Sequence, residues 1–233
     1  MIGTALVAGL AGAAGLLTYG ALEPTNGLFG PVTSRGPRQR VVYLTFDDGP
    51  NPGATPAILD TLSATGVPAA FFLVGRHVAR FPDLARRIAA TGHAIGNHTQ
   101  THVKLHCLGP RRIEQEIRRA HEIIVEVAGT VPRMFRAPHG YRNPFLFGAV
   151  RPFRYQVMGW SFGVWDTARP GAFEIRRRLR ARLGPGSILL LHDGDGYDPT
   201  GDRRQTAEAL PGIIEDVRAA GYEFRPLTEL VAA

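Results

Sequence analysis

The sequence predicts an α/β fold in which parallel strands alternate with helices. From residue 41 onward, short apolar runs alternate with segments whose apolar residues recur at helical spacing, over about 190 residues. Acidic and histidine residues directly follow several of the predicted strands, and α/β folds place their chemistry at the carboxyl ends of strands. The pattern leaves open whether the sheet is open or closes into a barrel.

Size and charge narrow the range of partners. The 233 residues suit one domain with a sizeable core plus an additional segment. The net charge of +7 could attract anionic lipid headgroups, phosphate-linked carrier lipids or acidic wall polymers. We expect no nucleic acid partner, because no basic helix interleaved with aromatic residues and no DNA- or RNA-binding motif occurs. The single cysteine, Cys107, excludes an intrachain disulfide, and no feature indicates an obligate protein partner.

The first 40 residues precede the predicted domain in two parts. Residues 1–22 contain the uncharged run Ile2–Leu22, which is long enough to cross a bilayer as a helix. No Lys or Arg precedes this run, which favours an uncleaved membrane anchor over a cleaved signal or a buried helix. Residues 23–40 are rich in Pro and Gly and predict an irregular linker, part of which packs on the domain or the membrane. We therefore expect a membrane-associated protein, but its side of the membrane stays open, because large domains can translocate despite flanking arginines.

The predicted domain, residues 41–233, begins with the stretch Val41–Pro50, which predicts a buried strand that is stopped by Gly49-Pro50. Further strands are expected at Ala69–Val74, at Ala94–Gly96, from Met134, at Gln156–Trp160 and at Ser187–Leu191. Helices are expected at Pro56–Ala64, Pro82–Thr91, Pro110–Ala128, Phe173–Leu183 and Thr206–Ala220. The arginines of the 173–183 helix are expected to face solvent, with a membrane or polyanion contact as the alternative.

Two adjacent acids, Asp47 and Asp48, end the first strand. Adjacent strand residues point to opposite faces, so we expect the two carboxylates to differ in role. One could hold a metal while the other handles protons. The alternative is a purely structural turn, because Asp-Asp-Gly-Pro is also good turn chemistry.

His98 and His102 stand four positions apart in His-Thr-Gln-Thr-His, directly after a predicted strand. On a helical turn this spacing puts both imidazoles on one side, close enough to share a metal. Two histidines and one aspartate form a three-ligand set with open positions, which suits Zn²⁺, Co²⁺, Fe²⁺ or Ni²⁺. Asp48 is the expected third ligand, and Asp47 the free carboxylate beside it.

Five short motifs follow one another between residues 41 and 193. They are Thr45–Pro50 (Thr-Phe-Asp-Asp-Gly-Pro), His98–His102, Phe135–Gly140 (Phe-Arg-Ala-Pro-His-Gly), Trp160–Thr167 (Trp-Ser-Phe-Gly-Val-Trp-Asp-Thr) and Leu189–Asp193 (Leu-Leu-Leu-His-Asp). In this order they resemble the five motifs of the NodB-homology polysaccharide deacetylases, carbohydrate esterase family 4. A single match would be weak, but five ordered matches make a chance resemblance very rare.

The resemblance implies a distorted (β/α) barrel of about seven parallel strands. It also implies metal-dependent hydrolysis of N-acetyl groups from N-acetylhexosamine units of a polysaccharide, wall polymer or lipid-linked saccharide. Asp48, His98 and His102 would bind the divalent metal, with Zn²⁺ expected first and Co²⁺, Ni²⁺ or Fe²⁺ as alternatives.

Roles for the base and the oxyanion site follow from the same resemblance. Asp47 would act as general base toward the attacking water, and Arg136 would pair with Asp47 to keep it ionised and aimed. The backbone N–H of His139 would stabilise the oxyanion. A merely structural ion pair between Arg136 and Asp166 is the alternative.

The acid and the acyl pocket complete the implied site. His192 would protonate the leaving amine, with Asp166 keeping it charged and oriented. Leu190 shares a strand face with His192 by the period of two, and would line the pocket for the acetyl methyl group.

Three positions depart from the family pattern. His139 replaces the usual Tyr of the third motif, Gly163 stands where the fourth often has its first Asp, and Thr167 replaces the Trp after Asp166. Trp165 could supply the aromatic wall instead. These changes leave the reaction intact and affect the sugar-binding groove.

Two alternatives to the N-deacetylase remain. One is a deformylase or O-acetyl esterase acting on a carrier-lipid-linked sugar, and the other is a non-catalytic family member that only binds glycan. A pure binder needs neither a base nor an acid, so the presence of both Asp47 and His192 argues against the second alternative.

Overall fold

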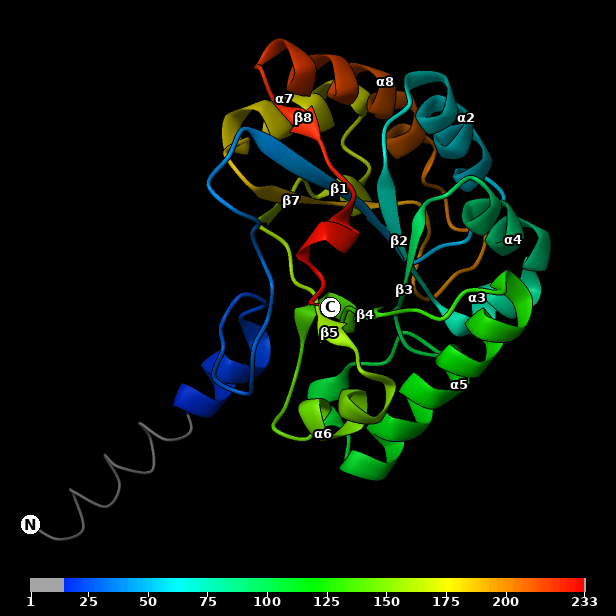
Figure 1. Cartoon of the computed structure of the whole chain (residues 1–233), viewed down its shortest axis with the longest axis vertical. Helices are drawn as coiled ribbons and strands as arrows, with labels where there is room; N and C mark the ends of the chain where they lie inside the picture. The colour runs from blue at the N-terminus through cyan, green and yellow to red at the C-terminus, as the bar shows by residue number, and fades with distance from the viewer. Residues whose placement is uncertain (1–14, 233) are drawn as a thin grey trace, which may run out of the picture.

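A curled sheet of parallel strands forms the centre of the computed structural model, which describes residues 15–232 (Figure 1). Its strands are β1 (Val41–Asp47), β2 (Ala69–Leu73), β3 (Ala94–Asn97), β4 (Met134–Phe135), β5 (Gln156–Val157), β6 (Phe162–Gly163), β7 (Ser187–His192) and β8 (Glu223–Phe224). The order is β5-β4-β3-β2-β1-β7-β6, and β8 pairs with β1 beyond this path. Within residues 15–232 no pairing joins β5 to β6, so the barrel is open there. The expected α/β barrel of about seven parallel strands is thus confirmed in a distorted, open form.

Helices cover the outside of this sheet (Figure 1). They are α2 (Thr55–Thr65), α3 (Gly75–Arg80), α4 (Pro82–Ala90), α5 (Pro110–Ala128), α6 (Leu146–Val150), α7 (Ala172–Arg182) and α8 (Arg204–Ala219). Short 3₁₀ turns are η1 (Leu105–Cys107), η2 (Pro138–Gly140), η3 (Arg151–Phe153), η4 (Asp166–Ala168) and η5 (Leu227–Leu230). The long helices lie where the apolar periodicity predicted them. The sequence did not predict α3, α6, β6 and β8, because elements of two to six residues are too short to show a period.

Alternation along the strands divides the core into an outer and an inner part. In β1, Val42, Leu44 and Phe46 join the large cluster beneath the helices. The intervening Tyr43 belongs to a smaller inner cluster. The same period places Thr45 and Asp47 on the inner face, so a catalytic side chain at the end of β1 points toward the barrel interior.

The inner cluster packs against the inner face of the sheet. Tyr43, Phe72 and Ile188 pack there with Leu227 of η5, which brings the C-terminal segment across the sheet. The carboxyl ends of the strands are left to the loops, and these loops hold the polar residues.

The predicted membrane anchor lies largely outside the described residues. Of the run Ile2–Leu22, only residues 15–22 are described, and they form a helix. Between residues 15 and 232, no helix is both long enough and apolar enough to cross a membrane.

The predicted linker is irregular and packs on the domain. Arg142, which is buried, donates to the carbonyl oxygens of Glu23 (2.7 Å) and Asn26 (3.1 Å), and its backbone N–H donates to Ala21 O (3.0 Å). Further along, Thr33 forms a bridge with Met158, next to the end of β5. Residues 21–33 are therefore fixed beside the loop that follows β4.

Candidate active site

The predicted site residues lie at or just beyond the carboxyl ends of five strands. These are Asp47 and Asp48 at β1, His98 and His102 after β3, Arg136 and His139 after β4, Trp165 and Asp166 after β6, and Leu190 and His192 on β7. Parallel strands end at one edge of a sheet, so residues far apart in sequence meet there.

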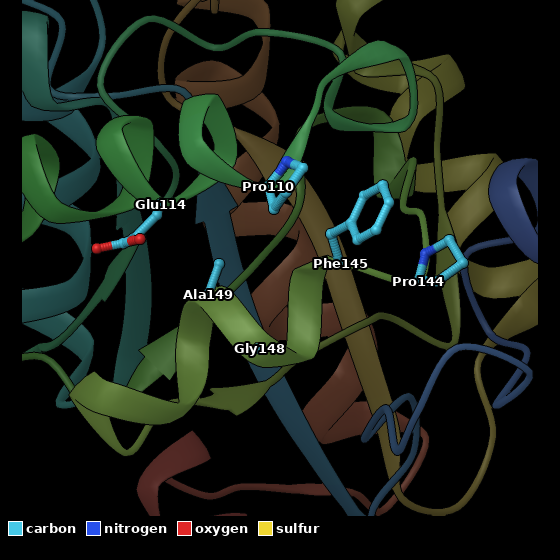
Figure 2. A pocket seen from close by; sticks show the side chains of 6 residues that line it. All are labelled: Pro110, Glu114, Pro144, Phe145, Gly148 and Ala149. Atoms are coloured by element: carbon cyan, nitrogen blue, oxygen red, sulfur yellow. The ribbon is translucent and has the colours of Figure 1, made fainter.

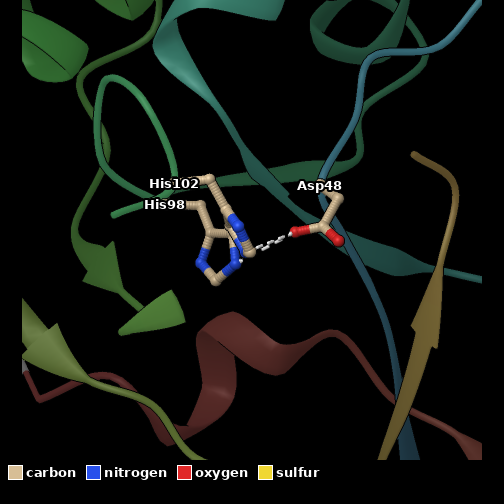
Figure 3. A group of neighbouring side chains, drawn as sticks. All are labelled: Asp48, His98 and His102. Atoms are coloured by element: carbon tan, nitrogen blue, oxygen red, sulfur yellow. Dashed lines mark ion pairs between the residues drawn. The ribbon is translucent and has the colours of Figure 1, made fainter. Parts of the chain in front are cut away.

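Asp48, His98 and His102 converge on one point (Figure 3). Asp48 Oδ1 lies 3.0 Å from His102 Nε2 and 3.3 Å from His98 Nε2. One potential ligand atom from each residue falls within 4.8 Å of the other two, and all three side chains are buried. The three residues that the sequence grouped therefore do lie together.

The backbone that brings the two histidines together is not a helical turn, contrary to the sequence-based expectation. Thr99 and His102 have positive φ angles of 70° and 59°. The side chain of Asn97 accepts a hydrogen bond from the Thr99 N–H (2.8 Å), and Thr99 Oγ1 accepts one from the His102 N–H (3.0 Å). Side chains that satisfy backbone donors compete with helix formation, and here they fold the segment into a tight loop.

The two aspartates also depart from simple strand alternation. Asp48 has φ 76°, so the chain leaves the strand geometry directly after Asp47. As a result both carboxylates reach the same histidine: His98 Nε2 lies 3.9 Å from Asp47 Oδ2 and 3.3 Å from Asp48 Oδ1. The two carboxylates nevertheless have different further partners: Asp47 pairs with Arg136, and Asp48 with His102.

The trio fits a divalent cation. His98 Nδ1 lies 2.8 Å from the carbonyl oxygen of Arg136, so Nδ1 carries the proton and Nε2 presents its lone pair to the site. Asp48 Oδ1 is buried, and no hydrogen bond to it is formed by any residue in the described part of the chain. Burial alone would raise the pKa of Asp48, but His102 and His98 hold this pKa well below its usual value, so the carboxylate is ionised. A buried anionic oxygen beside two imidazoles is a set of ligands suited to Zn²⁺ and related metals.

Asp47 is held by a buried arginine rather than by the histidines. Arg136 Nη1 donates to Asp47 Oδ1 (2.6 Å) and to Thr45 Oγ1 (2.9 Å), while Nη2 donates to Gly159 O (2.8 Å). The guanidinium is fully buried, 4.0 Å above the Phe72 ring. This charged hydrogen bond fixes the direction of the Asp47 carboxylate, and the alternative pairing of Arg136 with Asp166 is not observed.

Asp166 pairs with His192 instead. Its Oδ1 lies 2.9 Å from His192 Nδ1, and its Oδ2 accepts hydrogen bonds from the His192 N–H (2.8 Å) and Thr206 Oγ1 (2.9 Å). Burial lowers the pKa of His192, but Asp166 outweighs burial and raises this pKa to about 9. His192 thus carries a proton on a fixed ring, as a general acid requires.

His139 sits at the mouth of the site with a strained backbone. Its φ and ψ are 58° and 3°, inside η2. The turn is closed by the Gly140 N–H to Ala137 O and the Tyr141 N–H to Pro138 O, which leaves the His139 N–H outside the turn's own hydrogen bonds. Burial and His102 lower the pKa of the His139 side chain to about 4, so the imidazole is neutral at pH 7.

Leu190 and Trp165, the remaining predicted residues, differ in how far they are exposed to solvent. Leu190 is 8 % exposed and lies on the inner face of β7, in the register that pairs Thr45 with Leu190 and Asp47 with His192. A Cβ at Gly163 would lie 3.5 Å from the Leu190 side chain, so Gly163 leaves that leucine partly uncovered. Trp165 projects into solvent, with 71 % of its surface exposed.

Several supporting residues were not predicted from the sequence. Thr45 and Thr206 bind Arg136 and Asp166, and buried His77 contacts the Asp48 carbonyl oxygen through Nδ1 (2.8 Å). Thr45 could have been found, because it precedes Asp47 by two positions and shares its strand face. His77 and Thr206 stand far from any motif, so no local signal identifies them.

A shallow hollow elsewhere on the domain contains none of the predicted residues. It lies between the start of α5 and α6 (Figure 2) and is lined by Pro110, Glu114, Pro144, Phe145, Gly148 and Ala149. Its one acid, Glu114, pairs with Arg118 at 3.0 Å. The hollow therefore lacks the convergent polar groups of a catalytic site.

Comparison with known proteins identifies relatives of this chain. The sequence model of one family, described as polysaccharide deacetylase, matches residues 34–158. A chitooligosaccharide deacetylase of Bradyrhizobium sp. (strain ANU 289) is 39% identical over 200 residues, which cover 82% of this chain and 90% of that protein.

Solved structures identify relatives as well. A peptidoglycan N-acetylglucosamine deacetylase superposes with a TM-score of 0.79 at 32% identity, over 85% of this chain and 91% of that one. A pseudoenzyme of the CE4 family from Bacillus anthracis gives 0.77 at 26% identity, over 85% and 68% of the two chains.

Proposed function

This chain belongs to the polysaccharide deacetylase family, carbohydrate esterase family 4, and is a hydrolase of amide bonds; we propose that it removes N-acetyl groups from N-acetylhexosamine units of a glycan. The observation that carries the proposal is a base and an acid side by side. Asp47 and His192 are direct neighbours across β1 and β7, and each is held by its own buried partner.

Asp48, His98 and His102 would hold a divalent cation, with Zn²⁺ expected first and Co²⁺, Ni²⁺ or Fe²⁺ as alternatives. Such a cation would supply Lewis-acid polarisation of the amide carbonyl and a lowered pKa for the attacking water. Asp47 is the base that takes the proton from that water. Arg136 binds one oxygen of this carboxylate and directs the other into the site.

His192 delivers a proton to the leaving amine nitrogen. Asp166 holds the ring through Nδ1, so the opposite nitrogen, Nε2, is the proton donor. The His139 N–H is not used in its own turn, which leaves it free to donate to the oxygen that becomes negative during attack. Leu190, on the inner face beside His192, would contact the acetyl methyl group.

The substrate class comes from the named relatives, which act on chitooligosaccharide or on peptidoglycan N-acetylglucosamine. The test is acetate release from N-acetylglucosamine oligomers by the full chain after removal of metal and again with added Zn²⁺ or Co²⁺. We expect acetate release only with metal. A protein that binds metal and yet releases no acyl group from any amino-sugar amide would contradict the proposal.

Two alternatives are separated by other substrates and by binding without turnover. Formate release from an N-formylated carrier-lipid-linked sugar would indicate a deformylase, and acetate release from an O-acetylated one would indicate an esterase. A glycan binder without turnover would resemble the CE4 pseudoenzyme from Bacillus anthracis. The intact Asp47–Arg136 and Asp166–His192 pairs favour an active enzyme over this last alternative.

Membrane association is part of the proposal and rests on the N-terminal sequence. Residues 2–22 carry no charge, and in the described helix Leu16, Leu17, Tyr19 and Leu22 are exposed. Exposed apolar side chains in one segment suit a lipid surface. The test is sedimentation of the full chain with phosphatidylglycerol–phosphatidylethanolamine vesicles. We expect it to bind, and we expect L16S/L17S to bind more weakly; equal recovery in the supernatant with and without vesicles would contradict association.

A further inference from the structure

Tyr197 and His139 form a pair at the mouth of the site, although they come from different loops. The Tyr197 hydroxyl lies 2.8 Å from His139 Nε2, and the two rings are stacked with centroids 6.0 Å apart. Both rings meet the metal-ligand candidate His102 edge-on, with centroid distances of 4.9 Å for His139 and 5.0 Å for Tyr197. The pair therefore borders the position where the acetamide would be hydrolysed.

The loop after β7 fixes Tyr197 in this place. Asp195 Oδ1 accepts hydrogen bonds from the N–H groups of Tyr197 (3.0 Å) and Asp198 (3.1 Å), and Asp195 Oδ2 binds buried Arg203 at 2.7 Å. Arg76 donates to Gly196 O (2.6 Å).

Glycine is required before Tyr197. A Cβ at Gly196 would come within 2.1 Å of His102 Nδ1, so the loop packs directly on that histidine. The phenol is thus held by the loop backbone as well as by His139.

Tyr197 is nevertheless half exposed, so one side of the pair is open to solvent. A phenol and an imidazole offer hydroxyl and nitrogen partners for sugar hydroxyls, and a ring face for the apolar face of a pyranose. His139 also stands where the family motif usually has Tyr, so a phenol reaches this mouth from another part of the chain.

We propose that Tyr197 is a sugar-contacting specificity residue for the N-acetylhexosamine that is deacetylated, and that His139 positions its hydroxyl. This inference rests on the proposed function, since it assigns a subsite of the same site. Tyr197 contributes to holding the sugar rather than to the chemical step, because its hydroxyl is directed to His139 and not to Asp47 or His192.

The test compares Tyr197→Phe, which removes only the hydroxyl, with Tyr222→Phe as the matched control. Tyr222 precedes β8 at the opposite end of β1. For Y197F we expect KM for the N-acetylglucosamine tetramer to rise about 2- to 12-fold, as for one lost hydrogen bond. For Y197F we expect kcat and the Zn²⁺ dissociation constant to stay within about twofold of the wild-type values. Y222F should match the wild type in KM, in kcat and in the Zn²⁺ dissociation constant.

Binding measured without turnover separates this inference from the proposed function. In the Asp47→Asn background, calorimetry with the same tetramer should show the same rise in Kd on adding Y197F. If the wild type releases acetate while Y197F changes neither KM nor Kd, the inference is wrong. A Zn²⁺ dissociation constant that rises in Y197F would also overturn it, because Tyr197 would then support His102 and not the sugar. If the wild type releases no acetate, the proposed function is contradicted, and the inference about Tyr197 is contradicted with it.

Discussion

His98 Nδ1 and the backbone carbonyl oxygen of Arg136 are 2.8 Å apart, so a candidate metal ligand is oriented by the residue that holds the candidate base. The side chain of the same arginine binds Asp47 at 2.6 Å. The metal trio and the base are therefore parts of one hydrogen-bonded unit, and changes in Arg136 are expected to affect both.

Asp47→Asn should remove turnover while leaving metal binding intact. The amide cannot accept the proton from water, so we expect kcat to fall on the order of 10²- to 10⁴-fold. The Zn²⁺ dissociation constant should change little, because Asp48 and the histidines supply the ligands. Acetate release and calorimetry measure the two effects, and unchanged turnover would remove Asp47 from the mechanism.

Arg136→Lys should destabilise the fold as well as reduce activity. A lysine ammonium cannot reproduce the planar set of hydrogen bonds to Asp47, Thr45 and Gly159 O, so buried acceptors would be left without a donor. We expect a loss of about 1–3 kcal/mol in the free energy of unfolding, measured in urea.

Arg86→Lys is the matched control for that variant. Arg86 forms an exposed pair with Asp83, and such pairs contribute about 0–1 kcal/mol. Equal losses in the free energy of unfolding in the two variants would show that the buried Arg136–Asp47 pair stabilises the fold no more than the exposed pair does.

Asp166→Asn should shift the alkaline limb of the pH–rate profile to lower pH. His192 must be protonated to act as acid, so activity is present below the pKa of His192 and is lost as pH rises through it. Burial lowers the pKa of His192, but Asp166 raises it to about 9 when no cation is bound. A bound cation lowers this pKa again. Without the carboxylate we expect a further fall of about 1–3 units.

Asp60→Asn provides the control for the pH measurement. Asp60 is an exposed partner of Arg87 on the helical surface, so its loss should leave the limb in place. An alkaline limb that does not move in Asp166→Asn would mean that another group sets it.

Arg142→Met should release residues 21–26 from the domain. The change deletes the hydrogen bonds to Glu23 O and Asn26 O, each on the order of 1.5–3 kcal/mol because the donor is charged. Limited proteolysis should then cut near these residues faster than in Arg133→Met, whose exposed arginine donates to the Ala232 carbonyl oxygen. Equal cleavage rates would show that Arg142 does not hold the segment.

The sequence was a good guide to the fold and to the ligands, for physical reasons that the structure makes visible. Regular apolar periodicity located α5 and β1, and the motif order located Asp48, His98 and His102. Local backbone geometry could not be predicted in the same way. The positive φ angles of Asp48 and His102 depend on hydrogen bonds and packing within the folded loops. His77 reaches the site from a segment with no motif, because only the curled sheet brings it there.

Calorimetric titration with Zn²⁺ of the metal-free full chain and of His102→Ala tests the central claim most directly, namely that Asp48, His98 and His102 form one metal site. The account predicts one Zn²⁺ per wild-type chain and a dissociation constant at least on the order of 100-fold weaker in the variant. Equal stoichiometry and affinity in the two proteins would contradict it.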